Sequence, residues 1–379
     1  MGHKSKIIGF GLLFIVVIFE LFILFSGKHY LNKAIWYNFS KIDDYKIFDN
    51  HQVKSGKDNE EWAVRGDIYS FSEEFSTMHQ GLGTVAFLVI KEKQIVYEQY
   101  LENYNKVSVS GSFSVAKSYV GALVGVALKE GKIKRLSQKV GDFLPSFNTG
   151  RKSKITIQNL LTMSSGLDWH ESYSNPFANT TEIYYDADIQ TVIDKLKVIE
   201  PAGERFKYLS GDTQILALVL QKIYGKSLSH LLSEKLWKPM GCTQDALWST
   251  DKKGVEKAFC CLTASARDYA RLGQLYLQKG GWNGNQLIDS NYIMASTSPY
   301  NYPKDEVNYY GYQWWLLPDI KEENIFYMRG LHGQYVICIP NSNTIIVRLG
   351  HKRDKKDDGI HPNEVYLMVK EVLSNQNTK

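Results

Sequence analysis

The order of the hydrophobic patterns along the chain constrains its fold more than any other feature. Residues 84–90 and 94–101 are two β-rich runs joined by a short polar turn, which predicts a β-hairpin. A long stretch with helical periodicity follows, and β-rich runs return only after Tyr309. Strands at the two ends of the chain need a common sheet to bury their apolar faces, so we expect one antiparallel sheet. The later strands are predicted at 311–317, 325–329, 334–340 and 344–349.

The helical stretch begins with a clear one-sided apolar pattern. In residues 115–129 the side chains of Val115, Tyr119, Leu123 and Val126 fall on one helical face, and a glycine just past the end serves as a C-terminal cap. Further helices are predicted at 157–163, 189–196, 213–224, 228–236, 264–278 and 364–373.

This order predicts an α+β protein with two domains and an active-site cleft between them. A sheet-containing α/β domain, with helices flanking its antiparallel sheet, is assigned to residues 61–117 and 300–379. A mainly helical domain, residues 118–299, is inserted into it. Residues 28–60 are polar and aromatic without clear periodicity, and we interpret them as a stalk.

The N-terminus carries an apolar run from Ile7 to Phe25 in which Glu20 is the one charged residue. Its length matches the roughly 30 Å of a hydrocarbon core, so residues 1–27 are predicted to be a membrane anchor. A cleaved signal peptide is the alternative, although the residues after Phe25 match the small-residue cleavage pattern poorly. The prediction is a single-pass protein of the cell membrane whose catalytic part lies outside the cytoplasm.

Composition and motif spacing exclude several functional classes. The chain has 45 Lys and Arg against 40 Asp and Glu, scattered without a long basic block, which argues against nucleic-acid binding. The four cysteines show no C-x-x-C spacing, and H-E-x-x-H, phosphate-loop and dinucleotide-binding patterns are absent from the sequence. We therefore expect no cofactor and no metal site. Cys260 and Cys261 are adjacent, and we expect buried small residues that do not bond to each other.

A Ser-x-x-Lys tetrad stands where the hairpin region gives way to the first apolar helix. A spacing of three places Ser114 and Lys117 on one helical face, and a desolvated lysine can take the proton of a serine nucleophile. The start of the helix also offers backbone N–H groups to an oxyanion. Composition alone yields about two such tetrads by chance, by simple template counting. The other one, Ser249 to Lys252, lies in a polar turn, so the context favours Ser114.

Several longer segments accompany this tetrad, and together they are specific. With them the chain resembles the serine beta-lactamase and penicillin-binding-protein superfamily, in its class C-like branch of carboxypeptidases, esterases and 6-aminohexanoate-dimer hydrolases. The resemblance implies a beta-lactamase/transpeptidase-like fold, Ser114 as nucleophile, and Lys117 with Tyr208 as general base. The segments are Phe113-Ser114-Val115-Ala116-Lys117-Ser118, Leu160-Leu161-Thr162-Met163-Ser164-Ser165-Gly166-Leu167, Pro201-Ala202-Gly203-Glu204-Arg205-Phe206-Lys207-Tyr208-Leu209-Ser210-Gly211, Trp237-Lys238-Pro239-Met240-Gly241 and Ala266-Arg267-Asp268-Tyr269-Ala270-Arg271-Leu272-Gly273.

Two family elements depart from their usual form. Ser210 stands where the family's Tyr-x-Asn element has asparagine, so the amide that orients substrate is missing. The Lys/His-Thr-Gly triad is also missing. The segment in its place contains His332 and Gly333, and the resemblance implies the Gln334 N–H as an oxyanion donor beside the Ser114 N–H. A tight turn between two strands is the alternative interpretation of His332.

A loop after the second family segment could overhang the site. The loop holds Asp168, Trp169, His170, Glu171 and Tyr173. Of these, Asp168, Trp169 and Tyr173 are singled out as candidates for substrate contact, with a purely structural role as the alternative.

The sequence thus predicts a serine hydrolase that cleaves small-molecule or peptide amides or esters. One alternative is a D,D-carboxypeptidase, endopeptidase or beta-lactamase acting on cell-wall peptide or beta-lactams. An alternative of another class is a catalytically weak ligand-binding sensor on the same fold. The intact Ser114, Lys117 and Tyr208 favour the enzyme.

Overall fold

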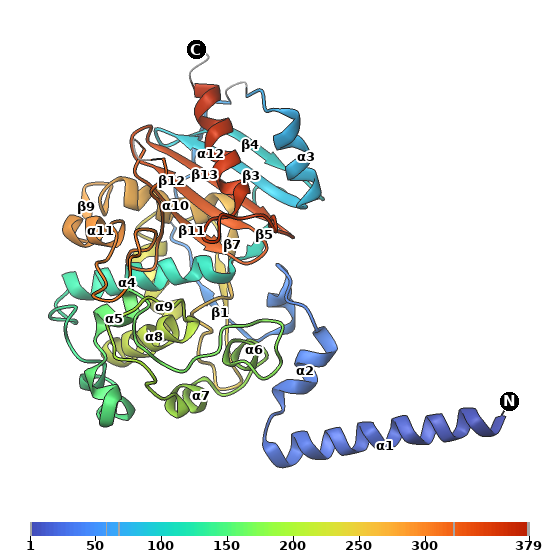
Figure 1. Cartoon of the computed structure of the whole chain (residues 1–379). Coiled ribbons are helices and arrows are strands. Elements are labelled where there is room, and N and C mark those ends of the chain that lie inside the picture. Colours follow the sequence, from blue (N-terminus) through green and yellow to red (C-terminus); the bar gives the residue numbers. More distant parts are fainter. Residues whose placement is uncertain (1, 58, 67–68, 321–322, 377–379) are drawn as a thin grey trace.

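A seven-stranded sheet forms the upper half of the molecule in the computed structural model, which describes residues 2–57, 59–66, 69–320 and 323–376 (Figure 1). Its strand order is β10-β11-β12-β13-β3-β4-β2, and all neighbours are antiparallel except β2 and β4. The N-terminal hairpin therefore lies beside the C-terminal strands in one sheet, as predicted. The strands are β2 (Ala63–Val64), β3 (Thr84–Lys91), β4 (Gln94–Tyr100), β10 (Trp315–Leu317), β11 (Ile325–Gly330), β12 (Gln334–Ile339) and β13 (Thr344–Gly350).

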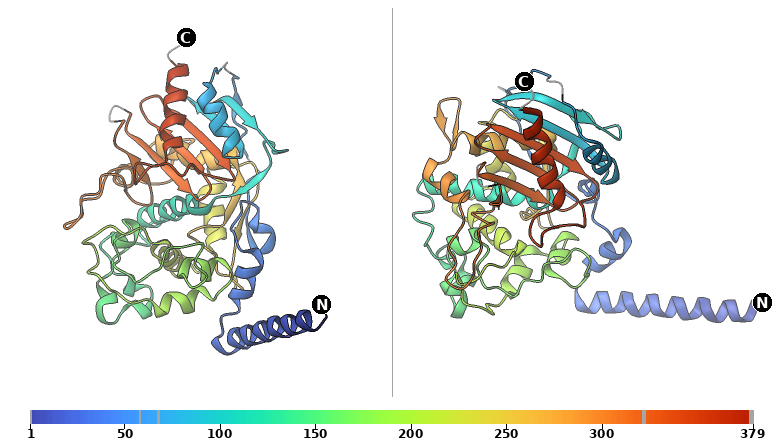
Figure 2. Two further views of the ribbon diagram at one scale, coloured as in Figure 1. Left: turned by 45° about the vertical axis from the view of Figure 1, so that its right-hand side comes forward. Right: turned by 45° about the horizontal axis from the view of Figure 1, so that its top comes forward.

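Helices cover both faces of this sheet, which explains why its central strands are buried throughout. On one face lie α3 (Glu73–Gly81) and α12 (Asn363–Gln376), packed on side chains such as Phe87 and Ile337. On the other face α10 (Ala266–Leu277) packs on β12 and β13, where Val336 and Cys338 point toward it. The two side views show this layering (Figure 2).

Below the sheet lies a mainly helical part, with α4 (Ala116–Lys129) running between the two. Almost every residue of α4 is buried, because the helix is covered from both sides and not along one face only. The other helices of this part are α5 (Ile157–Leu161), α6 (Asn179–Tyr184), α7 (Ile189–Lys195), α8 (Ser210–Tyr224), α9 (Leu228–Leu232), the π-helix η6 (Ser233–Trp237) and the short 3₁₀ turns η3 (Val140–Asp142), η4 (Pro145–Phe147) and η5 (Gly150–Lys154). Helix α11 (Ser290–Ser296) lies beside the sheet, above α4 in Figure 1.

A second, four-stranded sheet joins four distant parts of the chain in the order β1-β6-β7-β5. Its strands are short and each belongs to a segment without strong β periodicity, which is why the sequence did not predict it. They are β1 (Asn50–Val53), β5 (Val109–Gly111), β6 (Ala246–Ser249) and β7 (Leu262–Ser265); a small hairpin pairs β8 (Gly281–Trp282) with β9 (Asn285–Gln286).

The segment interpreted as a stalk is docked on the body of the protein. It contains α2 (Tyr30–Tyr37), the turn η1 (Asp44–Ile47) and β1, whose four residues pair with β6.

One predicted strand is shorter than expected. The run 311–317 was expected to be a strand, but only residues 315–317 form β10. The backbone N–H groups of Tyr312 and Gln313 donate to Ser296 and Leu161 in the helical part, so they are not available to the sheet.

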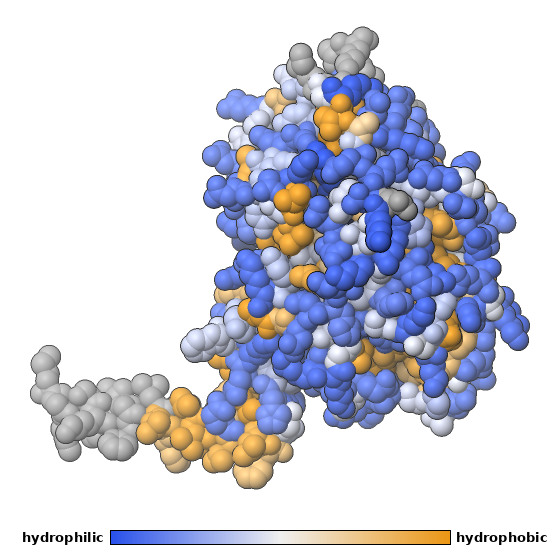
Figure 3. All heavy atoms as spheres, turned by 180° about the vertical axis from the view of Figure 1, so that it is seen from behind, coloured by the Kyte–Doolittle hydropathy of each residue, from blue (hydrophilic) through white to orange (hydrophobic). Residues whose placement is uncertain are grey.

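The prediction of a single-pass membrane anchor at residues 7–25 is wrong. Helix α1 (Gly2–Ser26) projects from the body, and apolar side chains such as Phe25 are exposed along its described part (Figure 3). Among the described residues, none of the helices has both the length and the apolar character needed to cross a membrane. The cell-membrane location and the extracytoplasmic placement lose their basis with it.

Candidate active site

Ser114 lies in the 3₁₀ turn η2 (Phe113–Val115), directly before α4. The residue before the turn is fixed to β7, because the Ser112 N–H donates to the Leu262 carbonyl at 2.7 Å. Phe113 has a φ of +46°, in the left-handed region that residues with a side chain rarely adopt. On the other side β11 approaches closely: a Cβ on Gly330 would lie 2.2 Å from the Ser112 carbonyl oxygen, so this position requires glycine. Ser114 itself is half-buried, so it remains accessible.

Lys117 lies one turn further along and points at the serine. Its Nζ is 2.9 Å from Ser114 Oγ and donates to the Phe259 carbonyl at 2.9 Å. The side chain is 1% exposed, and burial lowers its pKa to about 8, although the Glu171 carboxylate acts in the opposite direction. A lysine with a pKa near neutrality can exchange a proton with a serine hydroxyl.

Tyr208 completes a group of three. It lies just before α8, and Lys117 Nζ is 5.1 Å from the centroid of its ring. Burial raises the pKa of the phenol, and a hydrogen bond with Ser114 partly offsets this increase. Tyr310 and Trp315 pack around the ring at centroid distances of 6.0 and 5.4 Å. The structure thus brings together Ser114, Lys117 and Tyr208.

Ser210 is held by a carboxylate that the sequence analysis did not single out. Its N–H and Oγ donate to the two oxygens of Glu171 at 2.7 and 2.8 Å, and Trp169 Nε1 donates to the same carboxylate at 2.9 Å. The Ser210 hydroxyl proton is therefore committed to Glu171. The sequence placed Glu171 in the predicted substrate loop, but it did not predict the contact with Ser210.

The three loop candidates occupy different environments. Trp169 is 2% exposed and packs on α8, where a Cβ on Gly211 would lie 2.5 Å from its ring. Asp168 is exposed and accepts the Lys197 N–H at 2.7 Å. The Tyr173 hydroxyl is buried and has no hydrogen-bond partner among the residues that the structure describes. Burial raises the pKa of the Tyr173 phenol, and the nearby Glu171 and Tyr208 raise it further. Tyr173 therefore lies close to the site residues.

His332 and Gly333 form the turn between β11 and β12, with φ angles of +62° and +78°. The imidazole Nε2 donates to the Ser40 carbonyl at 2.9 Å, and the ring packs edge-on against Phe113 at 5.1 Å. Gln334 is the first residue of β12, and its side-chain amide donates to the Leu331 and Gly350 carbonyls. The His332 side chain is thus directed at Ser40, and the Gln334 side chain at the neighbouring backbone.

Arg329, on β11, is a site residue that sequence reasoning missed. Its guanidinium lies 4.8 Å from the Trp315 ring centroid, and its positive charge favours the ionised form of Tyr208. One Nη donates to the Ile360 carbonyl at 2.5 Å. It lies in residues 329–335, the segment that stands in place of the third family element, where the sequence pointed to His332 instead.

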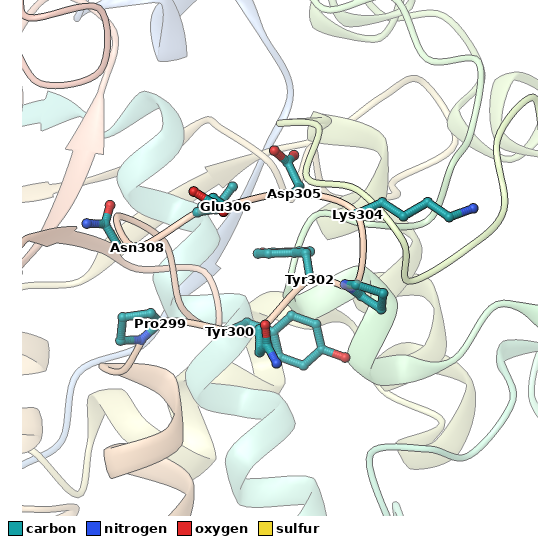
Figure 4. A pocket seen from close by; sticks show the side chains of 10 residues that line it. Pro299, Tyr300, Tyr302, Lys304, Asp305, Glu306 and Asn308 are labelled. Carbon is teal, nitrogen blue, oxygen red and sulfur yellow. The ribbon is translucent and has the colours of Figure 1, made fainter.

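A hollow beside the site is framed by residues 299–308, which curve around it (Figure 4). None of the predicted catalytic residues lines it. The loop is fixed to the segment before Tyr208, because Asp305 accepts the Phe206 N–H at 3.1 Å and Lys304 pairs with Glu204 at 2.7 Å. The loop therefore helps to fix the segment that leads to Tyr208.

Cys260 and Cys261 are buried, as expected, but they form a disulfide, so the prediction that they do not bond to each other is wrong. Cys261 has a φ of +70°, a backbone conformation that the spacing argument did not consider. The pair directly follows Phe259, whose carbonyl accepts from Lys117, so the disulfide lies next to one of the contacts that hold the lysine.

Comparison with known proteins identifies the family of this site. The family model described as Beta-lactamase matches residues 70–367. The chain belongs to the beta-lactamase family. A curated relative, the 6-aminohexanoate-dimer hydrolase of Paenarthrobacter ureafaciens, is 25% identical over 289 residues, covering 70% of this chain and 72% of that one.

Solved structures of the beta-lactamase family agree with the predicted fold. A putative 6-aminohexanoate-dimer hydrolase from Bacillus anthracis superposes with a TM-score of 0.76 at 25% identity, covering 88% of this chain and 92% of that chain. The octameric penicillin-binding protein homologue from Pyrococcus abyssi gives a TM-score of 0.59 at 18% identity, covering 79% and 76%. The beta-lactamase/transpeptidase-like fold is therefore confirmed, and this family member is a serine hydrolase of amides or esters.

Proposed function

We propose that the enzyme cleaves its substrate through an acyl-enzyme on Ser114, with Lys117 and Tyr208 as a coupled base. The observation that carries this proposal is the 2.9 Å contact between Lys117 Nζ and Ser114 Oγ, made by a buried lysine whose pKa is about 8. Neutral Lys117 accepts the serine proton as Oγ attacks the acyl carbon. As the bond between the acyl carbon and the leaving group breaks, Tyr208, within reach of Ser114, passes its proton to the leaving group and receives the one that Lys117 took from Ser114. Water then attacks the acyl-enzyme, and its proton returns to Ser114 Oγ through the same base.

The developing oxyanion needs backbone donors that already point at it. The Ser114 N–H, at the start of α4, is one. For the second we propose an N–H of β11 in place of the Gln334 N–H, because β11 is the strand whose Gly330 packs directly against the nucleophile's turn.

For the substrate we propose short esters or linear amides in preference to penicillins and cephalosporins. Two observations support this choice. Ser210 cannot replace the missing asparagine amide, since its N–H and hydroxyl are both bonded to Glu171. A relative that covers most of the chain is named for hydrolysis of a linear dimer, 6-aminohexanoate dimer.

A covalent probe tests the nucleophile. A fluorophosphonate should label the full-length enzyme at Ser114, located by peptide mass, and Ser114→Ala should lose both the label and several orders of magnitude of activity. Ser249→Ala is the matched control, because Ser249 belongs to the other Ser-x-x-Lys tetrad and its hydroxyl donates to Asn50. A Ser114→Ala variant that keeps most of its activity would contradict the assignment.

A substrate panel tests the class. We expect kcat/KM to be higher for a p-nitrophenyl ester and for a linear amide dimer than for a chromogenic cephalosporin. A kcat/KM of about 10⁶ M⁻¹s⁻¹ for the cephalosporin, well within the range of an enzyme on its own substrate, would show that the proposed preference is wrong.

A further inference from the structure

Residues 40–53, here called the N-terminal arm, precede the segment that matches the family model. The arm contacts β5, which leads to Ser114, and the turn between β11 and β12. We propose that this arm is a positioning element of the catalytic apparatus, in which Asp44 and the Ser40 carbonyl hold the strained turn that presents Ser114. The inference rests on the proposed role of Ser114 as nucleophile. Three separate contacts carry it.

The first contact joins the arm to the strand that leads into the nucleophile. The Gly111 N–H donates to the Ile42 carbonyl at 2.7 Å, three residues before Ser114. A Cβ on Gly111 would lie 3.0 Å from the Ile42 oxygen, so the two backbones are in close contact. Ile42 is buried, which fixes this part of the arm. The arm therefore acts on β5 through its backbone.

The second contact is made by Asp44 and passes through Tyr184. The Tyr184 hydroxyl donates to Asp44 Oδ2 at 2.7 Å, and both side chains are buried. The Tyr184 ring stacks on Phe113, with centroids 6.5 Å apart and planes 13° from parallel, and meets Tyr173 edge-on at 5.3 Å. Asp44 thus holds the ring that supports the residue directly before Ser114.

The third contact reaches the same residue from another direction. The Ser40 carbonyl accepts from His332 Nε2 at 2.9 Å, and the His332 ring packs edge-on against Phe113. Phe113 therefore packs against two rings that the arm anchors, Tyr184 and His332, and also meets Tyr173 edge-on at 6.1 Å.

The backbone of Phe113 explains why such support matters. Its positive φ is unfavourable for a residue with a side chain, and such a conformation persists only when its surroundings impose it. If one ring is released, Phe113 can relax toward an ordinary conformation and Ser114 shifts with it. A shift of about 1 Å at a reacting group can reduce the rate by about 100-fold.

The experiment compares variants of two neighbouring aspartates in the full-length enzyme. Asp44→Ala removes the acceptor for Tyr184, whereas Asp43→Ala removes an exposed carboxylate of the same arm that pairs only with Lys46 among the described residues. Asp44→Asn keeps an acceptor oxygen and serves as the conservative rescue. The readouts are the rate of fluorophosphonate labelling at Ser114, and kcat and KM for a p-nitrophenyl ester, each measured well below the variant's Tm.

We expect Asp44→Ala to lower the labelling rate and kcat by about 10 to 100-fold with KM within about twofold. Asp43→Ala should stay near wild type, and Asp44→Asn should recover most of the rate. If Asp44→Ala does not fold, Tyr184→Phe removes only the hydroxyl and should reduce kcat in the same way. Wild-type labelling and kcat in the folded Asp44→Ala or Tyr184→Phe variant would overturn the inference.

The two proposals fail in different ways. If the wild-type enzyme is labelled at a residue other than Ser114, the proposed function is wrong. If Ser114 is labelled in the wild type and the arm variants react at the same rate, only the positioning role of the arm is wrong.

Discussion

Two fully buried lysines, Lys117 in the active site and Lys257 beside the N-terminal arm, have similar surroundings but differ in one partner. Lys117 Nζ donates to the Phe259 carbonyl at 2.9 Å, and Lys257 Nζ donates to the Tyr184 carbonyl at 2.8 Å. Each ammonium also lies near an aromatic ring. Burial lowers the pKa of both to about 8.

The difference is the third contact of each lysine. Lys257 meets the Asp186 carboxylate at 2.6 Å, and Asp186 also pairs with Lys33 of α2 at 2.5 Å. Lys117 instead meets the Ser114 hydroxyl at 2.9 Å. A carboxylate partner forms an ion pair that makes the lysine part of the structure, whereas a hydroxyl partner gives the neutral amine a proton to accept. Burial prepares both lysines, and the neighbour decides what each one does.

Exchanging each amine for an apolar side chain is the strongest test of this comparison. Lys117→Met should lower activity by several orders of magnitude and leave the Tm unchanged or higher, because it removes a desolvated amine that forms no ion pair with any carboxylate the structure describes. Lys257→Met should keep activity within about threefold but lower stability by about 3 kcal/mol, because it breaks a buried ion pair. Activity assays and thermal denaturation of both variants measure this. An active Lys117→Met enzyme would refute the division of roles.

A double-mutant cycle tests whether Lys117 and Tyr208 act together in proton transfer. We propose no such coupling for Lys257. If the two form one proton-transfer unit, either Lys117→Ala or Tyr208→Phe disables it and the double variant loses little more. The combined loss of kcat/KM should therefore be smaller than the product of the single losses by about tenfold or more. Losses that simply multiply would mean that the two residues act independently.

The pH profile gives the smallest predicted effect. Activity requires neutral Lys117, so kcat/KM should rise with pH and level off above about 8. The Glu171 carboxylate favours the protonated lysine, so Glu171→Gln should move the midpoint to lower pH, by less than about one unit. Asp168→Asn, on the same loop but exposed, is the control and should leave the midpoint unchanged. A midpoint that moves upward in Glu171→Gln would contradict the assigned sign.

The parts of the fold that could be predicted from the sequence are those whose signal is local. The hairpin and the helix after Ser114 appear within one or two residues of their expected bounds, because apolar periodicity over ten or more residues is decisive. The four-stranded sheet was missed, since strands such as β1 and β5 are short and find their partners far along the chain.

The same distinction applies to the site. The spacing of Ser114 and Lys117 shows in the sequence because both lie on one helix. The Phe259 carbonyl that holds Lys117 leaves no trace there, because every residue has a carbonyl. Arg329 was missed, and Glu171 was named only with its loop, for a related reason: a charge acquires a role only from the groups that the fold places beside it.

The burial of α4 on all sides has a consequence for how this enzyme can evolve. The helix that carries the nucleophile also joins the sheet to the helical part, so almost any substitution along it disturbs the core of both. Residues 168–177 and 299–308 border the site and lie nearer the surface, apart from a few buried side chains such as Trp169 and Tyr302. Descendants of this chain can therefore acquire new substrates by changing these two loops, while the chemistry is inherited unchanged with the helix.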